Sequence, residues 1–148
     1  MAIKTFKILL ADDDQDDRLF FSKALKELPV TCDLTTVNDG IELMNFLNND
    51  DSELPDVLFL DINMPQKSGT ECLAEIKQNG WLKNLSIMFS TSNSPDAIKM
   101  VFNRGANVYI RKPNDFTKLK QVIYHALPIS TEALFTSAPV KYILNAWV

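Results

Sequence analysis

The sequence has few cysteines and no long apolar run, and both shortages exclude classes of protein. Its two cysteines, Cys32 and Cys72, form no CxxC pair, so neither a disulfide scaffold nor a cysteine metal site is expected. No apolar run approaches the roughly 18 residues that suggest a membrane-spanning helix. The first residues also lack the apolar stretch and cleavage site of a signal peptide. These absences predict a cytoplasmic protein in a reducing compartment, with no membrane partner.

Basic residues are fewer than acidic ones. The chain has 15 lysines and arginines against 19 aspartates and glutamates, a net charge of −4. The basic residues are scattered, and nucleic-acid binding would need a basic patch, so no nucleic-acid partner is expected. What the chain does have is enough apolar content, 46% over 148 residues, to bury the core of one ordinary domain.

Short apolar runs alternate along the chain with segments of helical spacing. Strict alternation of strands and helices predicts an α/β fold, a doubly wound parallel sheet covered on both faces. The predicted strands are 6–11, 32–37, 56–61, 86–90 and 108–111, and the predicted helices are 16–28, 41–47, 70–78, 96–104 and 115–127.

Charged and polar residues gather where the predicted strands end. The stretch "ILLADDDQDD" places five aspartates directly after the first strand. In an open parallel sheet, ligands bind beyond the carboxyl ends of the strands. At that edge the strands deliver Asp12 and Asp13, Asp61, either Ser90 or Thr91, and Lys112.

This set of side chains suits phosphoryl chemistry on a metal ion. Clustered carboxylates are costly unless a cation neutralises them. Mg²⁺ binds through a few carboxylates and shares a phosphate oxygen, and lysine supplies a point charge for a phosphoryl group. A carboxylate beside the metal can itself become the nucleophile that forms an aspartyl phosphate.

The acidic loop also has plainer interpretations. Asp14, Asp16 and Asp17 are read mainly as helix-cap and first-turn acids, which the N-terminus of a helix favours. A calcium loop of EF-hand type is not expected, because its sixth position would be Asp17 instead of glycine and its twelfth would be Lys23.

Over about residues 5–127 the chain resembles the receiver domain of the response regulators of two-component signalling. The resemblance rests on "ILLADDD", "PDVLFLDINMPQKSG", "SIMFSTS" and "GANVYIRKP", which occur in the family's order and approximate spacing. It implies a flavodoxin-like (βα)5 fold with five parallel strands in the order 2-1-3-4-5.

The resemblance also implies a role for each matching residue. Asp61 matches the phosphoacceptor, and Lys112 matches the phosphate-binding lysine. Asp12 and Asp13 match the acidic pair that holds Mg²⁺ (or Mn²⁺) together with Asp61, and Asn63 matches the position whose backbone carbonyl completes the metal site.

Two further residues match the switch that follows phosphorylation. Counting back from Gly105 and Lys112 by the family's usual interval favours Ser90 as the switch hydroxyl, with Thr91 as the alternative. Tyr109 matches the switch aromatic. The implied sequence of events moves the Ser90 hydroxyl toward the phosphate. Tyr109 then turns inward from the surface.

The resemblance therefore predicts a signalling switch and no enzyme. Asp61 would accept a phosphoryl group from a sensor histidine kinase or a histidine phosphotransfer protein, and the altered surface would bind a downstream protein target. One alternative is a binding module that works without phosphorylation. Another is a phosphatase of the haloacid dehalogenase type, disfavoured because Asn63 stands where such enzymes usually have a second aspartate.

The last residues depart from the minimal family pattern. The predicted receiver domain covers 1–127, and the apolar tail 128–148 is too short for an output domain. A stand-alone receiver is therefore expected. The tail is predicted to pack on the domain itself or on a partner, including a second subunit in a homodimer.

Overall fold

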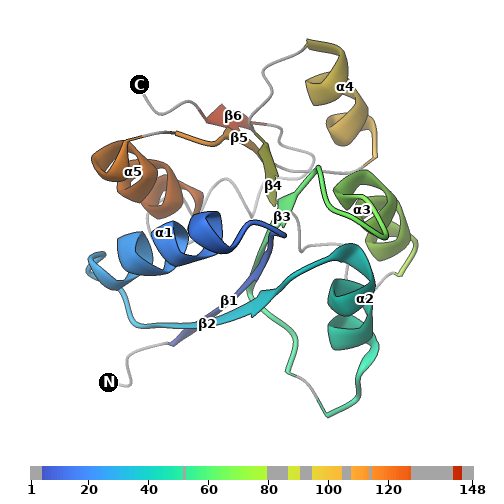
Figure 1. Cartoon of the computed structure of the whole chain (residues 1–148), viewed down its shortest axis with the longest axis horizontal. Helices are drawn as coiled ribbons and strands as arrows, with labels where there is room; N and C mark the ends of the chain where they lie inside the picture. Colours follow the sequence, from blue (N-terminus) through green and yellow to red (C-terminus); the bar gives the residue numbers. More distant parts are fainter. Residues whose placement is uncertain are drawn as a thin grey trace.

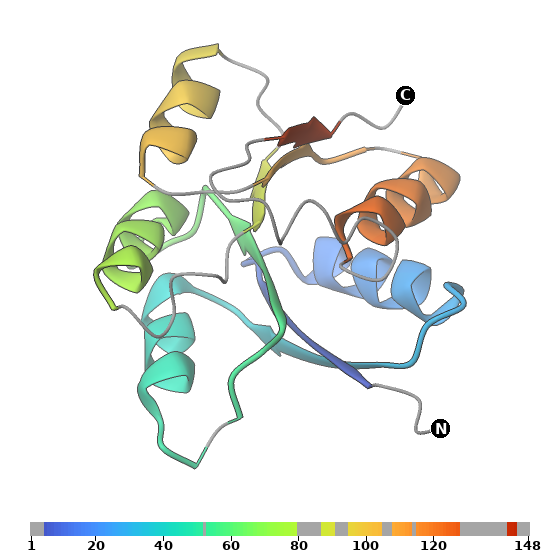
Figure 2. The same ribbon diagram turned by 180° about the vertical axis from the view of Figure 1, so that it is seen from behind.

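The protein is a three-layer α/β/α fold. The computed structural model describes residues 5–51, 53–79, 87–90, 95–104, 108–113, 115–127 and 142–144. A twisted parallel sheet runs through the middle, with α1 and α5 on one face and α2, α3 and α4 on the other (Figure 1). The view from behind shows the same two helical layers (Figure 2). Among the described residues, no helix combines the length and apolarity that crossing a membrane requires.

The elements follow the predicted alternation closely. The sheet has the order β2-β1-β3-β4-β5-β6, and every neighbouring pair is parallel. The elements are β1 (Phe6–Ala11), α1 (Gln15–Lys26), β2 (Cys32–Val37), α2 (Gly40–Asn48), β3 (Val57–Asp61), α3 (Gly69–Gln78), β4 (Ile87–Ser90), α4 (Pro95–Asn103), β5 (Val108–Arg111), α5 (Phe116–Ala126) and β6 (Tyr142–Leu144).

Helices begin where a side-chain oxygen can accept a free backbone N–H group. Asp14 caps α1 by accepting from Asp17 N–H, and Asp39 caps α2 in the same way. Ser68 and Glu71 form a reciprocal capping box at the start of α3. The short polar links after the strands therefore both end one element and start the next.

Two hydrophobic clusters hold the layers together, one on each face of the sheet. Along β1 the side chains alternate: Leu9 and Ala11 join the cluster that contains α2 and α3, whereas Ile8 and Leu10 join the cluster that contains α1 and α5. All five residues of β3 are buried, as expected for a central strand covered on both faces. The strand that carries Asp61 is thus held rigidly from both sides.

The prediction of five strands is wrong by one. The tail contributes a sixth strand, β6, whose residues Tyr142–Leu144 pair in parallel with Val108–Ile110 of β5. The order of the first five strands is as predicted. The sequence did not reveal β6 because three apolar residues make too weak a pattern, and its pairing depends on the free edge that β5 offers in the folded sheet.

The loop between β3 and α3 is very tightly packed at Gly69. The Gly69 N–H group donates to the Ile62 carbonyl at 2.8 Å, and a Cβ added at Gly69 would overlap the backbone oxygen of Asp61. Backbone atoms cannot retreat as a flexible side chain can. Three residues earlier, Gln66 has a φ of 70°, a left-handed conformation that glycine adopts more easily.

We expect Gly69→Ala to lower the free energy of unfolding by about 1–3 kcal/mol, because the added methyl group forces the β3 end and α3 apart. Gln66→Gly in the same loop should instead leave the stability equal or raise it by up to about 1 kcal/mol, since it relieves the left-handed residue. Urea unfolding of both variants measures this. A stable Gly69→Ala protein would show that the contact at Asp61 is not tight.

Candidate functional site

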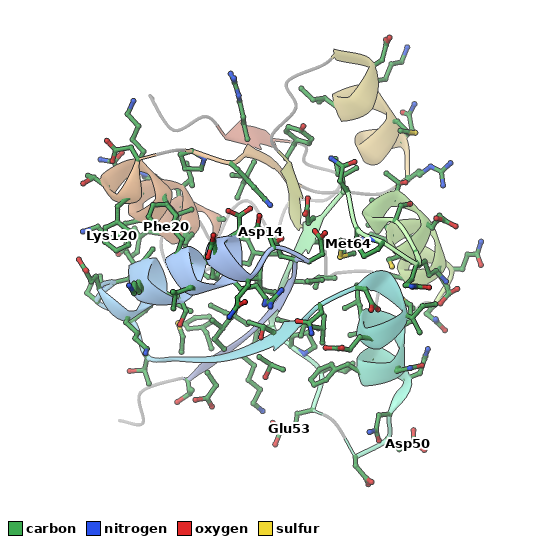
Figure 3. All side chains as sticks on the ribbon, viewed as in Figure 1. Asp14, Phe20, Asp50, Glu53, Met64 and Lys120 are labelled. Carbon is green, nitrogen blue, oxygen red and sulfur yellow. The ribbon has the colours of Figure 1, made fainter. Side chains whose placement is uncertain are left out.

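Three carboxylates meet at the carboxyl edge of the sheet. Asp12 and Asp13 follow β1, and Asp61 ends β3. Each offers one oxygen that lies within 4.8 Å of the others. Asp12 and Asp61 are only 2% and 6% exposed, whereas Asp13 is exposed. Asp14, labelled in Figure 3, marks the start of α1 beside this edge.

Lys112 reaches into the same cluster from the end of β5. Its ammonium nitrogen lies 2.8 Å from Asp12 Oδ2, 3.1 Å from Asp17 Oδ2 and 3.4 Å from Asp61 Oδ2. The first two contacts are hydrogen bonds that the ammonium group donates. The Lys112 side chain is 14% exposed, so these carboxylates replace most of the water that would surround it.

The pKa values of Asp61 and Lys112 are shifted by burial and by the charges around them. Burial raises the pKa of Asp61 to about 6, and the neighbouring charge of Asp12 also raises it, while Lys112 and the Asn63 N–H group act in the lowering direction. Burial alone would lower the pKa of Lys112. The hydrogen bond to Asp12 and the charges of Asp61 and Asp12 outweigh it and raise that pKa well above its usual range.

The donor set fits a hard divalent cation. Asp12, Asp13 and Asp61 bring three negative charges, and Lys112 compensates one of them. Mg²⁺ prefers such oxygen ligands and retains several waters at an open site. The exposed Asp13 keeps one side of the cluster open to solvent, which those waters require.

The structure brings Asp12, Asp13, Asp61 and Lys112 together as the sequence indicated. Ser90 is the last residue of β4, next to β3 in the sheet. Thr91 lies outside the described residues, so the choice between the two hydroxyls stays a prediction.

The metal role of Asn63 also stays a prediction. Its backbone N–H group donates to Asp61 Oδ1 at 3.3 Å, which closes a local turn after the strand. This contact helps to orient the carboxylate of Asp61. The family resemblance assigned metal binding to a different group of Asn63, its backbone carbonyl.

Tyr109 corrects one expectation. The sequence analysis placed its ring at the surface before phosphorylation, but the side chain is fully buried. It belongs to the hydrophobic cluster that also contains Leu60 and Met64, on the α2 and α3 face of the sheet. The sequence could not decide this, because one side chain can occupy either position on the same backbone.

Two residues of α1 belong to the site although the sequence analysis gave them no such role. Asp17 was read mainly as a first-turn acid, yet its carboxylate accepts from Lys112. Arg18 donates through Nη1 to the backbone carbonyl of Asp12 at 2.8 Å. Only the tertiary structure reveals these contacts, since Lys112 lies 95 positions from Asp17 along the chain.

We expect the Mg²⁺ affinity to fall as the pH drops through about 6. Above this pKa Asp61 is charged and available to a cation, and below it the proton occupies the carboxylate. One competing proton predicts a loss of about tenfold between about pH 7.5 and pH 5. Calorimetric titration with Mg²⁺ checks this, and a flat profile would contradict the raised pKa. In Asp61→Asn the residual affinity should lose this pH dependence.

Comparison with known proteins agrees with the geometry. A family model of the response regulator receiver domain matches residues 8–124. Response regulator Rcp1 of Synechocystis sp. is 31% identical over 121 residues, which cover 78% of this chain and 82% of Rcp1. The probable methanogenesis regulatory protein FilR2 of Methanothrix harundinacea is 27% identical over 122 residues, 80% of this chain and 79% of that protein.

Solved structures show the same fold. The phosphorylated cyanobacterial phytochrome response regulator RcpA aligns with a TM-score of 0.79 and 31% identity over 88% of this chain and 96% of that chain. The Mn²⁺-bound form of Rcp1 aligns with a TM-score of 0.74 and 30% identity over 90% of this chain and 97% of that one. With its flavodoxin-like sheet, its acidic cluster and these matches, the chain belongs to the response regulator receiver domain family of two-component signalling.

Proposed function

We propose that the protein is a phosphorylation-dependent signalling switch. Asp61 accepts a phosphoryl group from a phosphohistidine on a sensor histidine kinase or a histidine phosphotransfer protein, and the altered surface then binds a downstream protein target. The observation that carries this proposal is the placement of Asp61, buried at the end of β3 and in ionic contact with Lys112. The role is that of a regulatory phosphoacceptor domain and not of an enzyme with turnover.

The side chains divide the work of phosphoryl transfer. An oxygen of Asp61 forms the new bond to phosphorus, the bond to the histidine nitrogen breaks, and the imidazole keeps the electron pair. Lys112 lies 3.4 Å from Asp61 Oδ2, where its charge can stabilise the phosphoryl oxygens. When bound to Asp12, Asp13, Asp61 and the Asn63 carbonyl, Mg²⁺ (or Mn²⁺) would supply further neutralising charge.

The response to phosphorylation then involves Ser90 and Tyr109. The Ser90 hydroxyl, at the end of the strand beside β3, moves toward the new phosphoryl oxygens. Tyr109 is already buried in this structure, so phosphorylation stabilises an inward position that exists beforehand. The switch is thus a shift between two populations and not the creation of a new conformation.

The comparisons support this proposal at the level of chemistry. The similar RcpA structure is of a phosphorylated protein, and the similar Rcp1 structure holds Mn²⁺. A CheY from Borrelia burgdorferi, 28% identical with a TM-score of 0.65 over 80% of this chain and 86% of that chain, is complexed with CheX, beryllofluoride and magnesium. Beryllofluoride mimics a phosphoryl group on a carboxylate, so it is a suitable probe here.

With Mg²⁺ and acetyl phosphate, we expect intact-mass spectrometry to show one phosphoryl group per chain. Asp61→Asn should abolish the modification because it removes the nucleophile, while Asp33→Asn, an exposed carboxylate on β2, should leave it intact. Lys112→Ala should leave Asp61 open to modification but uncouple the structural response, seen in amide NMR shifts. An unmodified wild-type protein would indicate a phosphorylation-independent module, and rapid turnover of many phosphate esters would indicate a phosphatase.

We also propose that residues 1–127 form the receiver domain and that 128–148 form an extension packed on it. Pairing of β6 with β5 supports this. Truncation after Leu127 should speed hydrogen exchange of the β5 amides that face β6 by about tenfold or more, because their partners are lost. Removal of 145–148 alone, which spares β6, is the control. Unchanged exchange, stability and oligomeric state would count against the extension.

A further inference from the structure

We propose that Asp17 is a positioning residue that keeps the Lys112 ammonium group in the site while Asp12 and Asp61 are committed to a cation and a phosphoryl group. This role depends on the proposed function, because it concerns the lysine that the phosphoryl group needs. Asp17 would act through Lys112 and not by touching the phosphoryl group itself.

The contacts of the ammonium group are the first support. Its three N–H bonds face three carboxylates, with nitrogen–oxygen distances of 2.8 Å to Asp12, 3.1 Å to Asp17 and 3.4 Å to Asp61. The first two contacts are hydrogen bonds. Asp12 and Asp17 therefore each accept a hydrogen bond from the ammonium group, and Asp61, which would carry the phosphoryl group, lies within ion-pair distance of it.

The division of charge is the second support. Asp12 and Asp61 belong to the group of three carboxylates that could share a metal ion, and Asp17 does not. Once Asp12 and Asp61 are shared with a divalent cation, their attraction for Lys112 weakens and the two cations repel each other. Asp17 keeps its full charge for Lys112. Because its side chain is partly exposed, the desolvation free energy of keeping Asp17 ionised is small.

The space beside Lys112 is the third support. A small cavity of about 30 Å³ is lined by Asp12, Asp17 and Lys112 on its polar side, and the rest of its lining is Phe20, Phe21, Pro113 and Leu119. This volume is about that of one water molecule. The Lys112 side chain therefore borders a small free space. Lysine has four rotatable side-chain bonds, and without a tether it would regain rotamer freedom and hydration.

Asp17 itself is well anchored. Its backbone N–H group donates to Asp14 Oδ1 at 3.1 Å in the cap of α1. The next residue, Arg18, donates to the Asp12 carbonyl at 2.8 Å. The first turn of α1 is thus tied to the end of β1, and α1 and α5 lie side by side on this face, with Phe20 and Lys120 labelled between them (Figure 3). The Asp17 carboxylate, which extends from this turn, therefore starts from a fixed backbone position.

For Asp17→Asn, the inference and simple charge removal predict opposite changes in the affinity for a phosphoryl mimic. Loss of a negative charge near an anion site should strengthen anion binding if only long-range electrostatics act. If Asp17 holds Lys112 in place, Asp17→Asn should instead weaken the binding of a phosphoryl mimic. The neighbouring Asp16 is exposed and lies in the same helical turn, so Asp16→Asn is a matched control for charge and helix dipole.

The experiment measures beryllofluoride affinity by ¹⁹F NMR at saturating Mg²⁺. Asp17→Asn should weaken binding by about three- to tenfold, the size expected for a partly exposed charge-assisted contact. Asp16→Asn should bind as the wild type or slightly tighter. In a Lys112→Met background, Asp17→Asn should cause no further loss, because the residue through which Asp17 acts is gone. Asp17→Glu should recover part of the affinity.

Equal or tighter binding by Asp17→Asn would overturn the inference, and so would an undiminished loss in the Lys112→Met background. If wild-type protein with Mg²⁺ binds no beryllofluoride, the proposed function itself fails. A second measurement needs no variant: in the wild type saturated with Mg²⁺, the ¹⁵N-labelled Lys112 ammonium group should give a signal protected from solvent exchange. A freely exchanging ammonium group would contradict the tether, even if Asp17→Asn did not fold.

Discussion

The structure depends on one electrostatic constraint: carboxylates gathered at a single edge of the sheet must be neutralised. Asp12 and Asp61 are almost fully buried, and Asp13 adds a third charge within reach of both. Lys112 neutralises part of this charge and remains in contact with three acids. The uncompensated remainder makes the edge receptive to a divalent cation. The raised pKa of Asp61 expresses the same constraint, since burial beside Asp12 disfavours its charged form.

The fold supplies the rigidity that such a site needs. All of β3 is buried between two hydrophobic clusters, so Asp61 cannot move away from its neighbours to relieve their repulsion. Gly69 packs against the backbone oxygen of Asp61, and Arg18 holds the backbone of Asp12. Because the backbone is held in this way, the energy of charge repulsion stays in the site. A cation that binds these carboxylates reduces the repulsion, and the free energy released can bias a conformational equilibrium.

Tyr109 connects the carboxylate cluster with the packing of β5. It lies on β5, three positions before Lys112, and is buried in the cluster that contains Leu60, the neighbour of Asp61. The ammonium group that contacts the three acids therefore directly follows the strand that carries this packed aromatic ring. Beyond it, β6 adds an edge that the family resemblance did not imply. Changes in β5 would be transmitted to that strand through their shared hydrogen bonds.

The sequence by itself determined the alternation of strands and helices and the four residues Asp12, Asp13, Asp61 and Lys112. It could do so because parallel strands bring their carboxyl ends to one edge, and each of these residues ends or follows a buried apolar run. Only the tertiary structure decided the contact of Asp17 with Lys112, the inward position of Tyr109 and the pairing of β6. Each of these depends on which distant surfaces meet, on the free edge of β5 or on the choice between two rotamers, and no local pattern encodes such choices.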